Sequence, residues 1–82
     1  MSSSIPPPLR VALQNLRQVR SVKPQVGIET EEFAAWREQI AEALEALALV
    51  LIFPEDRERA ADEAKAARAE ARRIRSRLDI PS

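Results

Sequence analysis

The chain contains neither cysteine nor histidine in its 82 residues. Without cysteine it can form no disulfide and no thiolate metal site, and without histidine it lacks the most common general base near neutral pH. Its serines have no histidine to activate them as nucleophiles. A single glycine excludes the glycine-rich loops that bind phosphates. We therefore expect a protein that is not an enzyme, uses no metal or cofactor, and has no evident small-molecule substrate.

The chain is also short and poor in aromatic residues, with one tryptophan, two phenylalanines and no tyrosine. A domain of this size buries only roughly 60% of the surface that its unfolded chain exposes, so its stability is marginal. Association with another chain is one of the few remaining sources of stability for such a small scaffold. We expect one helical domain, over residues 9–80, that binds a second copy of itself or another protein.

No stretch reaches the roughly 20 consecutive apolar residues that a membrane-spanning helix needs. The first residues also lack the basic and apolar blocks of a signal peptide. Together with the absence of cysteine, these features predict a cytoplasmic protein with no membrane partner. Thirteen basic side chains balance thirteen acidic ones, and this zero net charge does not favour a nucleic acid as a bulk partner.

Large apolar residues recur at every third or fourth position between Thr30 and Leu51, which places them on one face of a helix. The members of this stripe are Phe33, Trp36, Ile40, Leu44, Leu47 and Leu51. Thr30 suits the N-cap position, and the carboxylates of Glu31 and Glu32 suit the positive end of the helix dipole. The pattern predicts a helix over residues 30–52.

Pro54 predicts the start of a second long helix, because proline is tolerated at the first helical position and forces the preceding residue out of helical geometry. A seven-residue repeat made mostly of alanine then continues toward the C-terminus. Its members are Ala60, Ala64, Ala67, Ala71, Ile74 and Leu78. Alanine favours the helix and lets a partner helix approach closely. The pattern predicts a helix over residues 54–79.

An antiparallel hairpin would place the large residues of the first long helix against the alanines of the second, so that the two layers interdigitate. In this register Leu44 lies near Ala64, and Phe33 lies near Ile74. One alternative is a single helix that continues through Pro54 and pairs only with another molecule.

The charges of the two long segments agree with the hairpin. Residues 29–45 carry a net charge of −5, from six glutamates and one arginine, and residues 65–77 carry a net +5, from six basic side chains and one glutamate. The hairpin brings these two segments side by side. We therefore predict an all-α fold, in which a short N-terminal helix precedes a long antiparallel hairpin and oligomerisation completes a helical bundle.

The N-terminal part of the chain divides into three short segments. Residues 1–8 are small, polar or proline, and we expect a disordered or polyproline lead-in. Residues 9–22 carry an apolar stripe and predict a short amphipathic helix, followed by a loop over residues 23–29. The stripe consists of Leu9, Leu13, Leu16 and Val19. We expect this helix to pack over the apolar end of the hairpin or to swap onto a neighbouring molecule.

The segment between residues 47 and 53 is apolar on all sides, which is more than one helical seam can cover. Exposed apolar patches mark interaction sites, whereas full cover by the N-terminal helix would make the segment part of the core. A buried strand is an alternative for so short a run. We predict a protein–protein interface, in a homodimer or a small subunit of a larger complex, formed by Leu47, Leu49, Leu51, Ile52 and Phe53.

A group of arginines near the C-terminus supports an alternative function, a small nucleic-acid-binding regulator. Its members are Arg68, Arg72, Arg73, Arg75 and Arg77. Basic helices contact phosphates, but no aromatic residues alternate with these arginines for base stacking. The acidic segment of the predicted hairpin would also cancel much of their positive field.

Overall fold

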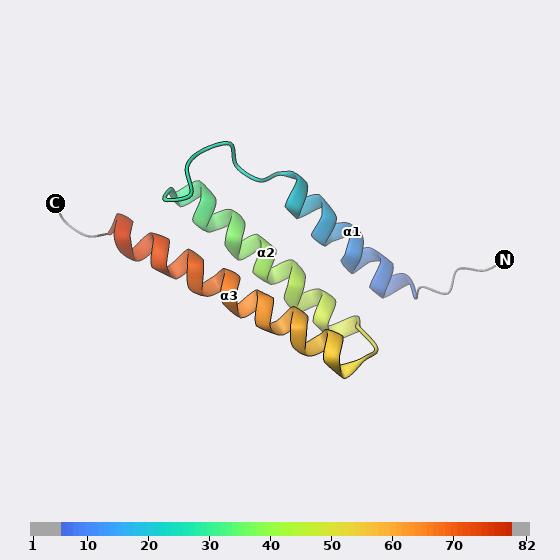
Figure 1. Ribbon diagram of the computed structural model, residues 1–82. Helices are drawn as coiled ribbons and strands as arrows, with labels where there is room; N and C mark the ends of the chain where they lie inside the picture. Colours follow the sequence, from blue (N-terminus) through green and yellow to red (C-terminus); the bar gives the residue numbers. More distant parts are fainter. Residues whose placement is uncertain (1–5, 80–82) are drawn as a thin grey trace.

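A computed structural model describes residues 6–79 and contains three helices and no strand in that range. Helix α1 spans Pro7–Ser21, α2 spans Glu31–Val50, and α3 spans Pro54–Leu78. Helix α2 and helix α3 pack as an antiparallel hairpin with α1 beside it (Figure 1). The predicted all-α fold is confirmed, whereas a strand at residues 47–53 and a continuous helix through Pro54 were wrong alternatives. No helix within residues 6–79 is both long and apolar enough to cross a membrane.

Helix α1 begins two residues earlier than predicted, at Pro7. Proline fits the first helical positions because its missing N–H has no partner there in any helix. Pro6 precedes the helix, and its carbonyl accepts a hydrogen bond from the Arg10 N–H at 3.0 Å. The last part of the predicted lead-in is therefore structured, while residues 1–5 lie outside the described part of the chain.

Both ends of helix α2 are set by local chemistry. The Thr30 hydroxyl accepts a hydrogen bond from the Phe33 N–H at 3.2 Å, as predicted for an N-cap. The helix ends at Val50, two residues before the predicted end, because Leu51 takes an extended conformation with φ −73° and ψ 144°. The Leu51 carbonyl then accepts a hydrogen bond from Arg57 Nε at 2.6 Å, which ties the turn to α3.

The core of the hairpin has the predicted register. Ile40 and Leu44 share one buried cluster with Ala64 and Ala67. Phe33 lies in a second buried cluster with Ala71 and Ile74. Large side chains of α2 therefore pack on the alanine repeat of α3, which confirms the prediction.

Helix α2 also contributes alanines of its own to this contact, which the sequence pattern did not predict. Ala34 and Ala41 are fully buried, at 0% exposure, and each shares a cluster with alanines of α3. Seven residues separate them, so they lie on the same side of α2. Small side chains on both helices allow the two backbones to approach closely.

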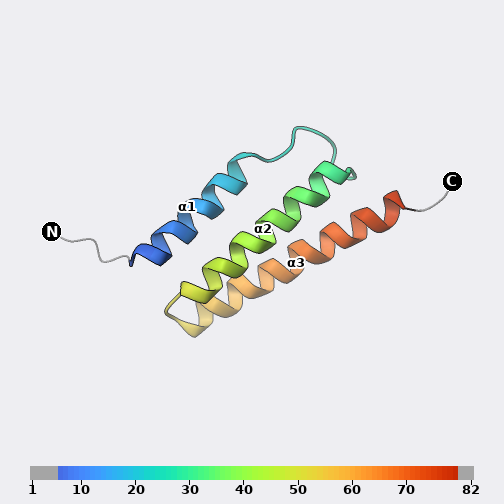
Figure 2. The same ribbon diagram turned by 180° about the vertical axis from the view of Figure 1, so that it is seen from behind.

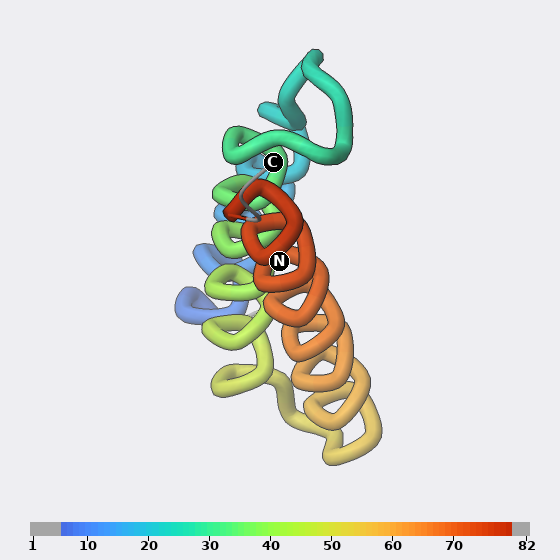
Figure 3. Tube along the Cα trace, turned by 90° about the vertical axis from the view of Figure 1, so that its left-hand side faces the viewer, coloured from blue at the N-terminus to red at the C-terminus, as the bar shows by residue number. Residues whose placement is uncertain are grey.

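The three helices form a single row with α2 in the middle (Figure 2). The backbone of α1 lies close to that of α2 but not to that of α3. The principal dimensions are 60 × 25 × 12 Å, so the molecule is about half as deep as it is wide. Figure 3 shows the same helices from one side, with α2 between α1 and α3. Most domains pack two or more layers around a core. The described part of this chain forms only one layer.

Candidate functional site

Three large apolar side chains project into solvent where α2 ends and turns into α3. Leu49 is 80% exposed, Ile52 65% and Phe53 64%. Leu49 lies in the last turn of α2, and the other two lie in the turn itself. Single exposed apolar residues are ordinary, but adjacent ones form a patch typical of binding surfaces. We refer to Leu49, Ile52 and Phe53 as the apolar tip.

The other two residues of the predicted interface lie elsewhere. Leu47 is buried, at 7% exposure, in the cluster that also contains Leu16 of α1 and Ala64 of α3. Leu51 is partly buried and packs against the same cluster. Leu47 therefore belongs to the core, because its side of α2 faces the two neighbouring helices. It is not available to a partner in the folded protein.

Helix α1 packs on part of the apolar end of the hairpin, at Leu47 and Leu51, but it leaves the apolar tip uncovered. The helix lies along the flank of α2 (Figure 1), where it buries Ala12 and Leu16 in the cluster that contains Leu47. Its C-terminal end is fixed to α2 by a hydrogen bond of 2.8 Å, which the Trp36 indole N–H donates to the Val19 carbonyl. Three residues of the apolar stripe of α1, Leu9, Leu16 and Val19, pack in or against this cluster, whereas Leu13 is 40% exposed.

An open apolar groove of about 560 Å³ lies between α1 and α2, next to the tip. Only one of its lining residues has a polar side chain, and Val11 is 63% exposed. The lining residues are Pro7, Pro8, Val11, Ala12, Asn15, Ala46 and Val50. We refer to these seven residues as the apolar groove. It was not predicted, since Val11 and Ala46 lie off the apolar stripes and come together only when α1 and α2 pair.

Two of the C-terminal arginines make close ion pairs with glutamates of α2. The Arg68 guanidinium donates two hydrogen bonds to Glu45, at 2.9 and 2.7 Å. The Arg75 guanidinium lies 2.7 Å from a carboxylate oxygen of Glu31 and 2.8 Å from one of Glu38. These contacts pair the acidic and basic segments as the hairpin register predicts. They also neutralise two members of the group considered for nucleic-acid binding.

A third member of that group is paired as well. Arg77 lies 2.6 Å from a carboxylate oxygen of Glu29, in the loop before α2. Arg72 and Arg73 are exposed and have no ion-pair partner within residues 6–79. The group therefore does not present five free cations on one surface.

The ion pairs make the stability of the fold depend on pH under acidic conditions. The hydrogen bond from Arg75 lowers the pKa of Glu31, and the hydrogen bond from Arg68 lowers the pKa of Glu45. A carboxyl group whose pKa is lower in the folded state stabilises the fold above its unfolded pKa, near 4.5. This contribution is lost as the pH falls through the folded pKa.

Arg75→Gln should therefore lower the melting temperature at pH 7 more than Arg72→Gln, which removes the same charge from the same helix but breaks no ion pair. The decrease should be small, because exposed pairs contribute little, and the difference between the two variants should shrink below pH 4. Thermal unfolding followed by circular dichroism at both pH values measures it. Equal melting temperatures at pH 7 would show that the Arg75 pairs do not stabilise the hairpin.

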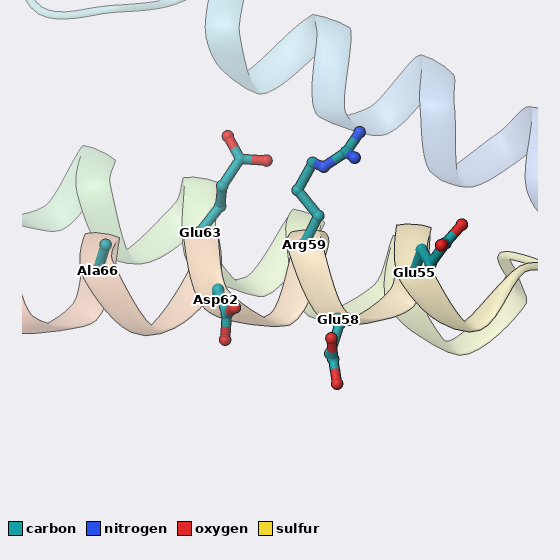
Figure 4. Close-up of a pocket in the computed structure, with 6 residues that line it drawn as sticks. All are labelled: Glu55, Glu58, Arg59, Asp62, Glu63 and Ala66. Atoms are coloured by element: carbon teal, nitrogen blue, oxygen red, sulfur yellow. The ribbon is translucent and has the colours of Figure 1, made fainter.

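The acidic side chains of α3 do not converge on a point. Glu55, Glu58, Asp62 and Glu63 line a shallow surface with Arg59, but Glu58 and Asp62 point away from α1, whereas Arg59 and Glu63 point toward it (Figure 4). Within residues 6–79 no three carboxylates are grouped closely enough to hold a metal ion. We find no arrangement for metal chemistry in this part of the chain.

Within residues 6–79, the fold consists of three helices and carries an apolar tip beside an apolar groove. No protein-family model matches the chain, and neither a curated protein nor a solved structure shows significant similarity to it. Its function is therefore inferred from its own residues.

Proposed function

We propose that the protein is a non-enzymatic interaction module that binds a protein partner through the apolar tip, as a homo-oligomer or as a small subunit of a larger complex. The observation that carries this proposal is the exposure of three large apolar side chains within residues 49–53, at 64–80%. Fully burying each such side chain is worth about 1.5–3 kcal/mol. Most of this free energy is still to be gained, because the chain's own helices leave the tip uncovered.

The tip alone is not enough for stable association. Losing free translation and rotation costs an estimated 4–15 kcal/mol or more, and a typical specific interface buries about 800 Å² on each partner. The apolar groove adjoins the tip through Val50 and adds Val11 to the exposed apolar area. A binding surface that combines tip and groove buries more apolar area than the tip alone and so offsets more of these costs.

Further exposed apolar side chains lie in and beside the loop between α1 and α2. Val22, Val26 and Ile28 are 53%, 48% and 59% exposed. This loop precedes α2 and the tip follows it, and the lining of the apolar groove includes Val50 beside the tip and no residue of the loop. The groove next to the exposed side chains favours the tip as the binding surface.

Ile52→Glu should leave the helices intact and dissociate the complex. Ile52 lies in the turn between α2 and α3 and belongs to neither buried cluster, so the charge should not disturb folding. Placing an unpaired carboxylate in an interface should weaken binding at least about tenfold, or roughly 1.4 kcal/mol. Circular dichroism measures helicity, and light scattering after size-exclusion chromatography measures mass.

Ile28→Glu is the matched control, since it makes the same change at a similarly exposed position away from the tip. The size of the complex that each variant forms is also measured in an extract of cells that make the protein. This second measurement detects a complex with a partner other than a second copy. An Ile52→Glu protein that keeps both the wild-type mass and the wild-type complex size would rule out the tip as the binding surface.

A further inference from the structure

The apolar tip and the apolar groove lie at the same end of the molecule and have matching chemistry. We propose that the partner is a second copy of this chain, in a two-fold dimer in which Ile52 and Phe53 of each copy enter the apolar groove of the other. This inference rests on the proposed function and names the partner of that surface.

The groove is suited to apolar side chains rather than to a polar ligand. Six of its seven lining residues are proline, alanine or valine, and Asn15 is the exception. Its volume of about 560 Å³ falls within the range of roughly 300–1,000 Å³ that small-molecule pockets span, so it has room for more than one side chain. Ile52 and Phe53 are adjacent in the chain, project from the same turn and can enter it together.

The positions of the tip and the groove favour a closed dimer. Val50 lines the groove and lies only three residues before Phe53, so the two features adjoin each other on every copy. A two-fold axis between two such ends brings each tip to the other copy's groove in one encounter. Both contacts are then satisfied by a single partner, as in an isologous interface, and no unpaired surface remains to extend the assembly.

Area and charge are also consistent with a second copy. One face of the layer extends over 60 × 25 Å, so a copy has a face large enough for the 800 Å² or so that each partner of a specific complex buries. The net charge is zero, so two copies do not repel each other overall. Two single layers packed on this face also form the two-layer architecture that one copy lacks.

The absence of cysteine makes disulfide cross-linking a direct test. Asn15→Cys places a thiol in the groove, and Ile52→Cys places one at the tip, while Phe53 is kept in both. An equimolar mixture of these two single variants is oxidised gently, so that any bond between positions 15 and 52 must join two molecules. We expect a covalent dimer of about twice 9.2 kDa, formed at least tenfold faster than with either variant alone, because a disulfide needs Cα atoms within about 7 Å.

The matched control is a mixture of Ile28→Cys with Ile52→Cys, which should give little dimer. Val11→Glu changes the groove and should dissociate the dimer, as Ile52→Glu should do by changing the tip. Val22→Glu is the control for Val11→Glu and should leave the dimer intact, because Val22 is also exposed but lies at the other end of α1, away from the groove. Mass spectrometry of the cross-linked peptides identifies the joined positions. A cross-link between positions 15 and 52, together with loss of the dimer in Val11→Glu, distinguishes entry into the groove from simple contact between apolar surfaces.

The outcomes distinguish this inference from the proposed function. Cross-links between two Ile52→Cys molecules without any to Asn15→Cys would show contact between tips, which overturns the groove while keeping the tip as the binding surface. A wild-type mass of 9.2 kDa at millimolar concentration would overturn the second copy and leave another protein as the occupant. A dimer that survives both Ile52→Glu and Val11→Glu would overturn the inference and the proposed function together.

Discussion

Ala67→Leu should lower the free energy of unfolding by about 3 kcal/mol, at the upper end of the cost of overpacking. Ala67 is 0% exposed and shares a cluster with Ala41, which is also 0% exposed, so three added carbons can be accommodated only by separating α2 from α3. A chain of this length is stable by roughly 4–12 kcal/mol. A loss of about 3 kcal/mol should lower the melting temperature by about 12–24 °C.

Ala66→Leu provides the control for this prediction, because it makes the same substitution at the neighbouring position, where the side chain is exposed. Thermal and urea unfolding of both variants, followed by circular dichroism, give the two free energies. Similar melting temperatures for the two proteins would mean that close packing of alanines is not what holds α2 against α3.

Leu16→Asp should remove about a quarter of the helical signal and leave the hairpin folded. Helix α1 is attached to α2 through two buried residues, Ala12 and Leu16, and an unpaired carboxylate at the second would detach it. An isolated helix of 15 residues is marginal in water, so the detached helix should melt. Helix α1 supplies 15 helical residues, beside 20 in α2 and 25 in α3.

Far-UV circular dichroism measures the lost helicity, and the fluorescence of the only tryptophan reports the separation of α1. Trp36 should emit at longer wavelength once its indole N–H loses the Val19 carbonyl and faces water. Leu13→Asp is the matched control on the same helix, since Leu13 is already 40% exposed. A Leu16→Asp protein that keeps its full helicity, or that loses all of it in one step, would contradict this view of α1.

The hairpin was predictable because independent features of the sequence agree on it. Pro54 sets the break, and the alanine repeat selects one side of α3. The acidic and basic segments agree with the same register, and the contacts of Arg75 with Glu31 and of Arg68 with Glu45 match it. Each of these signals is local, or depends only on two long helices lying antiparallel.

The position of α1 and the make-up of the binding surface were not predictable in the same way. In the apolar run before Pro54, helical spacing places Leu47 on the stripe that packs on α3, and Leu47 is buried. Spacing leaves Leu49 off that stripe but cannot say whether α1 covers it, because that depends on where α1 lies around α2; Leu49 remains exposed. The apolar groove has no sequence signal at all, since its two walls come from different helices.

The row of three helices also determines how the fold can come apart. Because the backbones of α1 and α3 do not come close to each other, the two helices are coupled mainly through α2, in the nearest-neighbour manner of helical repeat arrays. Helix α1 can open locally while α2 and α3 stay paired, whereas opening of α2 releases both neighbours. The middle helix therefore sets the global stability, and the groove, which has one wall on α1, exists only while the least firmly held helix is in place.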